Sequence, residues 1–215
     1  MTQRLRISFA RRDGTRYLSH LELMRMWERT LRRAGWRLAY SHGFNPHPKM
    51  SLAAALPVGV AGEAELMEVQ LETARPVEEA ATELASQLPS GIEVRAVEDV
   101  PLDAPALQRS LQAAEYLAVC PKAPSEDQLL REVERMVAAE QLMRERKKEA
   151  RVQSYDLRPM IRFLEATRDG AGRPVVRMEL RTDAQGAGRP DEVLREMGLD
   201  PADCDITRIR LLLRS

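Results

Sequence analysis

The chain has 215 residues, enough for one large domain or two small ones with a buried core, and its 33 basic and 33 acidic side chains give a formal net charge of zero. No signal peptide or apolar run of membrane-spanning length is present, so we expect a cytoplasmic protein without a membrane partner. The two cysteines, Cys120 and Cys204, form no Cys-x-x-Cys pair, which argues against a disulfide scaffold, a zinc knuckle or an iron–sulfur cluster held by this chain alone.

The first 35 residues predict a strand followed by a helix. Residues 4–10 alternate polar and apolar side chains, which is typical of a strand with one buried face. Ser19 and Glu22 form a capping-box pattern at the start of a helix, and Gly35 suits the position after its last turn. Apolar residues recur between them at helical spacing. The other face of this helix carries Arg25, Arg29, Arg32 and Arg33.

The segment Tyr40–Leu56 concentrates the unusual side chains of the chain. Its Gly43, Pro46 and Pro48 exclude a helix and disfavour a central strand. A constrained polar loop of this kind is typical of a recognition segment, and we expect strands before it at residues 36–39 and after it at residues 50–60. The side chains that could contact a ligand are Tyr40, His42, Phe44, Asn45, His47 and Lys49.

Residues 65–100 complete a first structural unit. Their pattern predicts a strand at 65–72, a helix opened by Pro76, and a closing strand at 92–97. The order strand, helix, two or three strands, helix, strand is that of the split βαβ, ferredoxin-like plan.

A similar order begins again after a proline-containing linker. Residues 147–162 have no regular pattern, but the other segments fit strand, helix, strand, helix, strand at 114–119, 125–138, 175–181, 190–197 and 206–213. We therefore expect an α+β fold with two tandem ferredoxin-like units and antiparallel sheets. The expected boundaries are 1–100 for the unit with the recognition loop, 101–112 for the linker and 113–215 for the second unit.

Charge is distributed unevenly along the chain. Residues 1–50 carry ten Arg and Lys49 against three acidic residues, a net charge of +8, whereas residues 51–100 have a net charge of −8. This asymmetry indicates a basic face suited to a polyanion. The alternative is that the two stretches mix in the fold and neutralise each other.

The two loop histidines have several interpretations. A metal site needs three or four ligands, and the loop offers no nearby Cys, Asp or Glu to complete one. His42 or His47 could cleave RNA without metal, with Lys49 stabilising the phosphorane. They could instead brace the loop by hydrogen bonds. A further interpretation is ligand contact without chemistry, with Phe44 or Tyr40 stacking on a base and the cations on phosphates.

Three runs together resemble a known family. Residues 16–22 (RYLSHLE), 40–49 (YSHGFNPHPK) and 155–159 (YDLRP), in this order, resemble the radical-SAM-linked family of bacterial proteins. That domain of unknown function occurs alone or fused behind a B12-binding-type radical SAM enzyme, and its genes often lie near ribonuclease and ribosomal-protein genes. The resemblance implies a partner that performs radical chemistry. It identifies no catalytic residue in this chain. The order of elements is also similar to that of the CRISPR repeat-RNA endoribonucleases, a likeness of fold alone.

These observations predict an RNA-binding accessory module for a partner radical SAM protein, acting on tRNA or rRNA. Because the sequence contains no Cys-x-x-x-Cys-x-x-Cys motif, we expect no cofactor in this chain and place S-adenosylmethionine and the iron–sulfur cluster on the partner. The alternatives are a metal-independent endoribonuclease that uses His42 or His47 and a protein–protein adaptor. The nucleic-acid-binding residues predicted are Arg25, Arg29, Arg32, Arg33, Tyr40, His42, Phe44, Asn45, His47 and Lys49.

Overall fold

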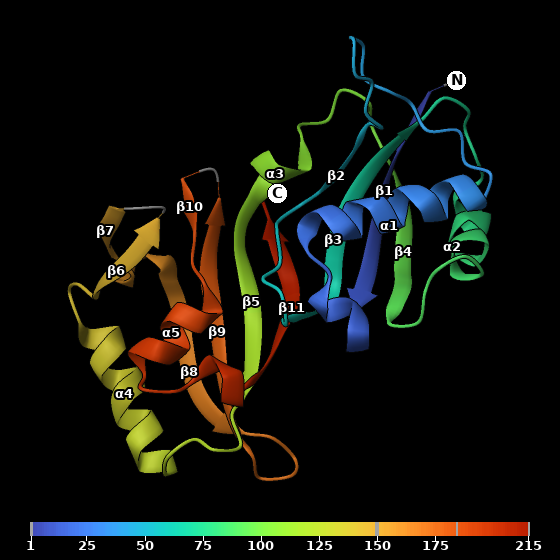
Figure 1. Cartoon of the computed structure of the whole chain (residues 1–215). Helices are drawn as coiled ribbons and strands as arrows, with labels where there is room; N and C mark the ends of the chain where they lie inside the picture. Colours follow the sequence, from blue (N-terminus) through green and yellow to red (C-terminus); the bar gives the residue numbers. More distant parts are fainter. Residues whose placement is uncertain (1, 149–150, 184, 215) are drawn as a thin grey trace. The chain divides into compact units, whose positions relative to one another are not determined.

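The computed structural model describes residues 2–148, 151–183 and 185–214, without the side chains of residues 146–148 and 151. The chain divides into two compact units: unit 1 ends at Leu111, and unit 2 runs from Gln112 to Arg214. Each unit combines helices with a sheet whose described strand pairs are antiparallel, which confirms the predicted α+β class (Figure 1). Within the described residues, no helix is long and apolar enough to cross a membrane.

Unit 1 has the strand order β4-β1-β3-β2, and each neighbouring pair is antiparallel. This is the order that the split βαβ plan requires. In chain order the elements are β1 (Gln3–Arg11), η1 (Asp13–Tyr17), α1 (His20–Arg33), β2 (Met50–Leu52), β3 (Ala61–Leu71), α2 (Val77–Ala85), β4 (Ile92–Val100) and α3 (Leu107–Ser110).

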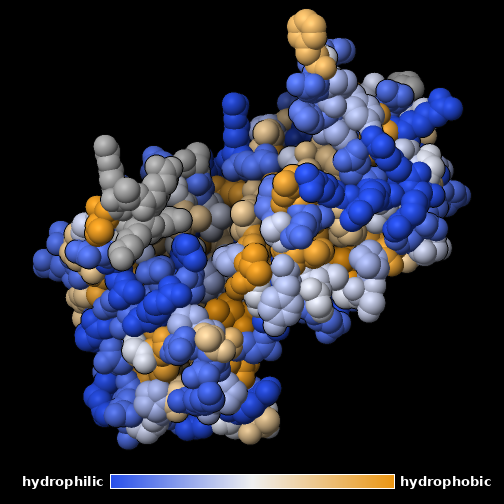
Figure 2. Space-filling model, viewed as in Figure 1, coloured by the Kyte–Doolittle hydropathy of each residue, from blue (hydrophilic) through white to orange (hydrophobic). Residues whose placement is uncertain are grey.

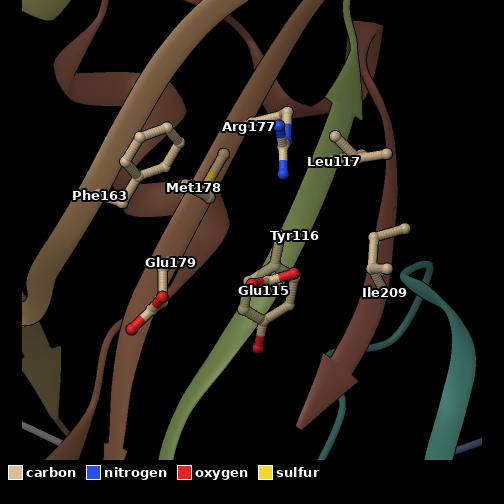
Figure 3. A pocket seen from close by; sticks show the side chains of 8 residues that line it. All are labelled: Glu115, Tyr116, Leu117, Phe163, Arg177, Met178, Glu179 and Ile209. Atoms are coloured by element: carbon tan, nitrogen blue, oxygen red, sulfur yellow. The ribbon is translucent and has the colours of Figure 1, made fainter. Parts of the chain in front are cut away.

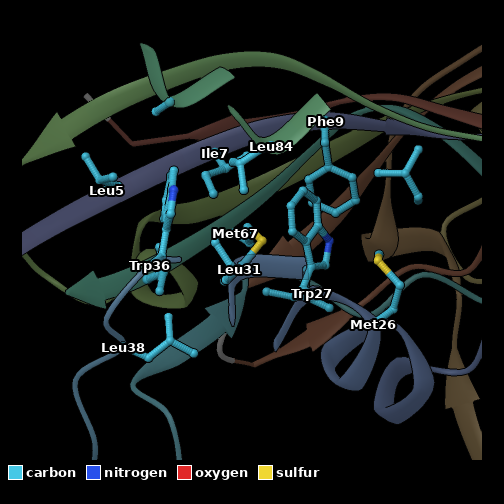
Figure 4. Close-up of a cluster of buried hydrophobic side chains, with 14 of the residues drawn as sticks. Leu5, Ile7, Phe9, Met26, Trp27, Leu31, Trp36, Leu38, Met67 and Leu84 are labelled. Atoms are coloured by element: carbon cyan, nitrogen blue, oxygen red, sulfur yellow. The ribbon is translucent and has the colours of Figure 1, made fainter. Parts of the chain in front are cut away.

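The core of unit 1 lies between β1 and α1. Leu5, Ile7 and Phe9 of β1 face Trp27 and Leu31 of α1, and all five are fully buried (Figure 4). The rings of Phe9 and Trp27 meet edge to face with their centroids 4.9 Å apart. Burial of this apolar stripe holds α1 on the sheet, so its opposite face is turned to solvent.

Unit 2 has the strand order β8-β9-β5-β11, with the short β10 also paired to β9. The order is again that of a split βαβ unit, interrupted by the separate β6–β7 hairpin. Its elements are β5 (Leu111–Val119), α4 (Glu126–Ala138), β6 (Met143–Lys148), β7 (Arg151–Asp156), η2 (Arg158–Met160), β8 (Ile161–Arg168), β9 (Pro174–Asp183), β10 (Gly186–Ala187), α5 (Pro190–Glu196), η3 (Pro201–Asp203) and β11 (Asp205–Leu213).

The structure differs from the sequence-based expectation in four places. Residues 36–39, expected to be a strand, form only an isolated bridge, between Leu38 and Leu71. The stretch at 147–162, expected to be irregular, contains β7 and belongs to the hairpin that precedes β8. The strand expected over residues 50–60 ends at Leu52, and the chain then turns at residues 57–60, where Gly59 has φ of 89°, before β3 begins. Cys120 and Cys204 form a disulfide within unit 2, although their number and spacing argued against a disulfide scaffold.

Candidate functional site

The outer face of α1 presents a row of arginines. Ser19 caps the helix by accepting a hydrogen bond from the Glu22 backbone N–H, and the Glu22 carboxylate accepts one in return from Ser19 N–H, so the predicted capping box is confirmed. Strongly hydrophilic side chains gather over this helix in Figure 2. The exposed arginines of the row are Arg25, Arg29, Arg32 and Arg33.

Two members of the row lack a hydrogen-bonded or ion-paired partner among the described residues, although the Glu22 carboxylate is near enough to Arg25 to interact with its charge. Within the described part of the chain, Arg25 and Arg29 form no hydrogen bond or ion pair. Arg33 donates to the Gln87 carbonyl, which leaves its charge in place. Exposed guanidinium groups at helical spacing, without acidic partners, are suited to phosphate oxygens.

Arg32 connects this row to the recognition loop. Its guanidinium donates a hydrogen bond to the Tyr40 hydroxyl, lies 5.9 Å from the centre of the Tyr40 ring and forms an ion pair with Glu28 at 2.8 Å. The hydrogen bond with Tyr40, together with the nearby Glu28 carboxylate, raises the pKa of Arg32. The arginine face and the loop are therefore parts of one continuous surface.

The loop is a hairpin with a hydrogen-bonded stem. Ser41 N–H donates to the His47 carbonyl at 2.8 Å, and His47 N–H donates back to the Ser41 hydroxyl at 3.0 Å. Below them, Lys49 N–H donates to the Ala39 carbonyl at 2.8 Å. Gly43 has φ of 129°, a conformation that favours glycine. The segment projects between α1 and β2 at the top of Figure 1.

The base of the stem is attached to β3. Ala39 N–H donates to the Gln70 carbonyl at 2.9 Å, and Gln70 N–H donates to the Lys49 carbonyl at 2.8 Å. These bonds extend the edge of the sheet into the hairpin. The hairpin is thus held by backbone hydrogen bonds at two isolated bridges, Leu38 with Leu71 and Tyr40 with Pro48, and by the Ser41 hydroxyl.

The tip of the hairpin exposes its side chains. Phe44 is 106% exposed, so its ring gains nothing from the protein core. His42, Asn45 and His47 are also exposed, and none of their side chains hydrogen bonds with a described residue. A fully exposed aromatic ring at a braced loop tip is suited to stacking on an unpaired base.

The geometry gives the histidines no catalytic partner among the described residues. A histidine that acts as a base is normally oriented by a second group through its other ring nitrogen, and neither imidazole has one here. The bracing bonds at His47 come from its backbone and not from its ring. Across the described residues, no three His, Cys, Asp or Glu side chains are grouped as metal ligands.

Most predicted residues lie on one surface, but Lys49 lies apart from the tip. It stands at the foot of the hairpin and lines a hollow of about 350 Å³ in unit 1. Sequence reasoning missed the other polar residues of this hollow, Arg4, Ser51, Glu68 and Gln70. Polar and apolar residues alternate along β1 and β3, and this pattern places Arg4, Glu68 and Gln70 on one face of the sheet. Nothing in the sequence indicates that the segment after β4 covers this face.

The YDLRP run at residues 155–159 has a structural role. The Asp156 carboxylate accepts from the backbone N–H groups of Leu142 and Arg158, at 2.8 and 2.9 Å. The Arg158 guanidinium donates to the carbonyls of Val137 and Ile161, both at 3.0 Å. These two side chains therefore join the end of α4 to the start of β8.

Unit 2 has a hollow of its own on the sheet, of about 420 Å³ (Figure 3). Arg177 lies 6.0 Å from the centre of the Phe163 ring and 3.6 Å from a carboxylate oxygen of Glu165. Glu115, on the neighbouring strand, pairs with Arg210 at 2.7 Å. Because each charged residue of its lining forms an ion pair, and two of the three are acidic, this hollow does not share the basic character of α1.

The charge asymmetry of the sequence is partly cancelled in unit 1. Arg4 and Arg6 both bind Glu68, and Arg12 binds Glu63, so part of the +8 stretch is neutralised by the −8 stretch. The arginines of α1 take no part in these pairs. The basic face that the sequence predicted is therefore smaller than the whole N-terminal stretch and is centred on α1.

Comparisons with known proteins place the chain in a family. A comparison with curated proteins finds no significant match. A chain of a Cbf5-Nop10-Gar1 complex is similar with a TM-score of 0.49 and 12% identity over 96% of this chain, which spans 48% of that one. A "putative glycine cleavage system transcriptional repressor" has a TM-score of 0.27 and 14% identity over 99% of both chains. The profile of a family described as an uncharacterized protein conserved in bacteria, DUF2344, matches residues 4–190, and the chain belongs to this family.

Proposed function

We propose that the protein is an RNA-binding accessory module that presents tRNA or rRNA to a partner radical SAM enzyme. The observation that carries the proposal is the continuous surface formed by the α1 arginines and the hairpin, joined by the bond between Arg32 and Tyr40. Cations without acidic partners contact phosphates, and an exposed ring beside them stacks on a base. Unit 1 offers both on the same surface.

The residues divide into two roles. Arg25, Arg29, Arg32, Arg33 and Lys49 contact the phosphate backbone. Tyr40, His42, Phe44, Asn45 and His47 contact the nucleotide. The phosphate contacts provide affinity without sequence information, whereas the loop contacts provide preference for an unpaired nucleotide.

The partner is supported by the resemblance to the radical-SAM-linked family. Radical SAM chemistry needs S-adenosylmethionine and a cluster held by three cysteines, and this sequence has two cysteines in all. The proposal therefore assigns the modification to the partner and RNA presentation to this chain.

Salt dependence of RNA binding tests the proposal. We expect binding of fluorescently labelled tRNA or rRNA fragments, followed by anisotropy, to weaken steeply as salt rises, because phosphate contacts release counterions. The double variant Arg25→Gln/Arg29→Gln lowers the slope of log K against log salt by about 2. Arg131→Gln is the matched control, since Arg131 is an exposed arginine of α4 without a hydrogen bond or ion pair to the described residues.

Other outcomes identify the alternatives. Absent or salt-insensitive binding contradicts RNA presentation, and recovery of a radical SAM protein on co-purification would then favour the adaptor. Cleavage of RNA by the wild type without metal, lost in His47→Ala, would replace the accessory role with a nuclease.

A further inference from the structure

The hollow at the foot of the hairpin lies on the sheet face opposite the core of unit 1. Ser51 of β2 pairs with Glu68 of β3, and Gln70 follows two residues after Glu68. Side chains two apart in a strand share a face, and Met67 and Val69, which alternate with Glu68 and Gln70 along β3, belong to the core. Lys49, Ser51, Glu68 and Gln70 therefore face away from α1 and line the hollow together.

The floor of this hollow is a fixed ionic cluster. Arg4 and Arg6 share the Glu68 carboxylate, with nitrogen–oxygen distances of 2.6 and 2.8 Å, and the Arg4 and Glu68 side chains are only 7% and 5% exposed. Two guanidinium groups on one carboxylate leave a net positive charge. The floor is thus electropositive and rigid.

Arg4 itself has no donor left for a ligand. Its Nε and one Nη2 hydrogen go to Glu68, and its remaining hydrogens go to the carbonyls of Pro101, Ala104 and Pro105, at 3.4, 2.6 and 2.9 Å. These bonds bring the segment after β4 across the sheet face. Ala104 and Ala106 of that segment form a small apolar wall of the hollow.

Three side chains of the hollow keep their hydrogen-bonding capacity. In the described structure the Lys49 amine, the Ser51 hydroxyl and the Gln70 amide form no hydrogen bond with another residue. An ammonium group suits a phosphate, and an amide beside a hydroxyl offers donors and acceptors to a base edge. The volume of about 350 Å³ is at the lower end of the range of small-ligand sites.

We propose that this hollow binds one unpaired nucleotide of the RNA, with its phosphate on Lys49 and the edge of its base on Gln70 and Ser51. This inference rests on the proposed function, because it names the part of the RNA that unit 1 selects on the sheet face opposite α1. Lys49 belongs to both the hairpin and the hollow, so a strand that stacks on the loop passes the mouth of the hollow. A paired base cannot enter, since its hydrogen-bonding edge is already occupied.

Free mononucleotides test the hollow without any larger RNA. The four 5′-monophosphates, AMP, GMP, CMP and UMP, are titrated into the labelled full chain and followed by NMR. We expect saturable shifts of the Gln70 side-chain amide and of the backbone amides at residues 49–51, larger for some bases than for others. No shift there, or an equal shift with inorganic phosphate alone, overturns the proposal.

Variants then separate this site from the arginine surface. Gln70→Ala and Ser51→Ala should each weaken binding of an RNA with a single-stranded loop by about tenfold and leave binding of a fully paired duplex unchanged. Gln141→Ala is the matched control, since Gln141 is exposed in unit 2 and its side chain has no partner among the described residues. Steep salt dependence with no effect of Gln70→Ala overturns the hollow and leaves the proposed function intact. Mononucleotide shifts without binding of any longer RNA support the hollow and count against the proposed function.

Discussion

At the scale of single residues, the most consequential polar group of unit 1 is the buried carboxylate of Glu68. Removing it leaves Arg4 charged and buried without its partner, so we expect Glu68→Leu to lower the free energy of unfolding by about 3–5 kcal/mol. Urea denaturation measures this. The double variant Arg4→Met/Glu68→Leu should recover part of the loss, because it removes the two buried charges and leaves only the more exposed Arg6 without its partner. Equal losses in the single and double variants would show that the cost is steric.

Unlike Glu68, Phe44 does not stabilise the fold, and its exposed ring is available for contact with RNA. Its ring is fully exposed, so Phe44→Ala should leave the unfolding transition unchanged. The same substitution removes a stacking platform and should cost about 1–3 kcal/mol of RNA binding. Phe163→Ala is the control for loss of an exposed ring, since Phe163 lies on β8 of unit 2. Equal effects of the two substitutions on anisotropy would argue against a specific role of Phe44.

At the scale of elements, α1 depends on its capping box. The hydrogen bond from the Ser19 hydroxyl, with a second from its backbone N–H, lowers the pKa of Glu22. Because the pKa of Glu22 is lower in the folded state, ionisation of this carboxylate stabilises the fold fully at pH values above the unfolded-state pKa. This stabilisation is lost as the pH falls through the folded-state pKa. We expect Ser19→Ala to raise the pKa of Glu22 towards its ordinary value, as measured by NMR titration, and to destabilise the helix. An unchanged pKa would mean that the box does not persist in solution.

The elements also show what the sequence could and could not predict. The strand β1, the helix α1 and its cap follow local patterns, so periodicity and capping were enough to predict them. The β6–β7 hairpin was missed because its charged strands, of sequence MRERKK and RVQSYD, have no apolar alternation. Its pairing depends on backbone hydrogen bonds, which leave no pattern in the side chains.

The surface of α1 and the hairpin could be predicted from the sequence, whereas the hollow at the foot of the hairpin could not. Both the arginine face and the hairpin tip are local in sequence, and their residues could be named in advance. The hollow assembles Arg4, Gln70 and Ala104 from three distant segments, which only the pairing of β1 with β3 and the path after β4 bring together. Non-local packing of this kind has no signature in a single sequence.

At the scale of the whole molecule, the two units should be separable in function. Every residue assigned to RNA lies in unit 1, whereas the disulfide between Cys120 and Cys204 lies in unit 2 and spans a separation of 84 residues. We expect Cys120→Ser/Cys204→Ser to lower the free energy of unfolding by about 2–4 kcal/mol and to leave the salt slope of RNA binding unchanged. Wild type treated with a thiol reductant should match the variant. Loss of RNA binding in either would show that unit 2 also supports the RNA surface.

The central claim is that RNA lies on the hairpin of unit 1, and crosslinking tests it most directly. Trypsin cuts after Arg37 and Lys49, so residues 38–49 leave the protein as one peptide that contains the whole hairpin tip. After irradiation of the full chain with tRNA or rRNA fragments, the account predicts nucleotide adducts on this peptide, identified by mass spectrometry and lost in Phe44→Ala. Adducts confined to peptides of unit 2, or none on residues 38–49, would contradict it.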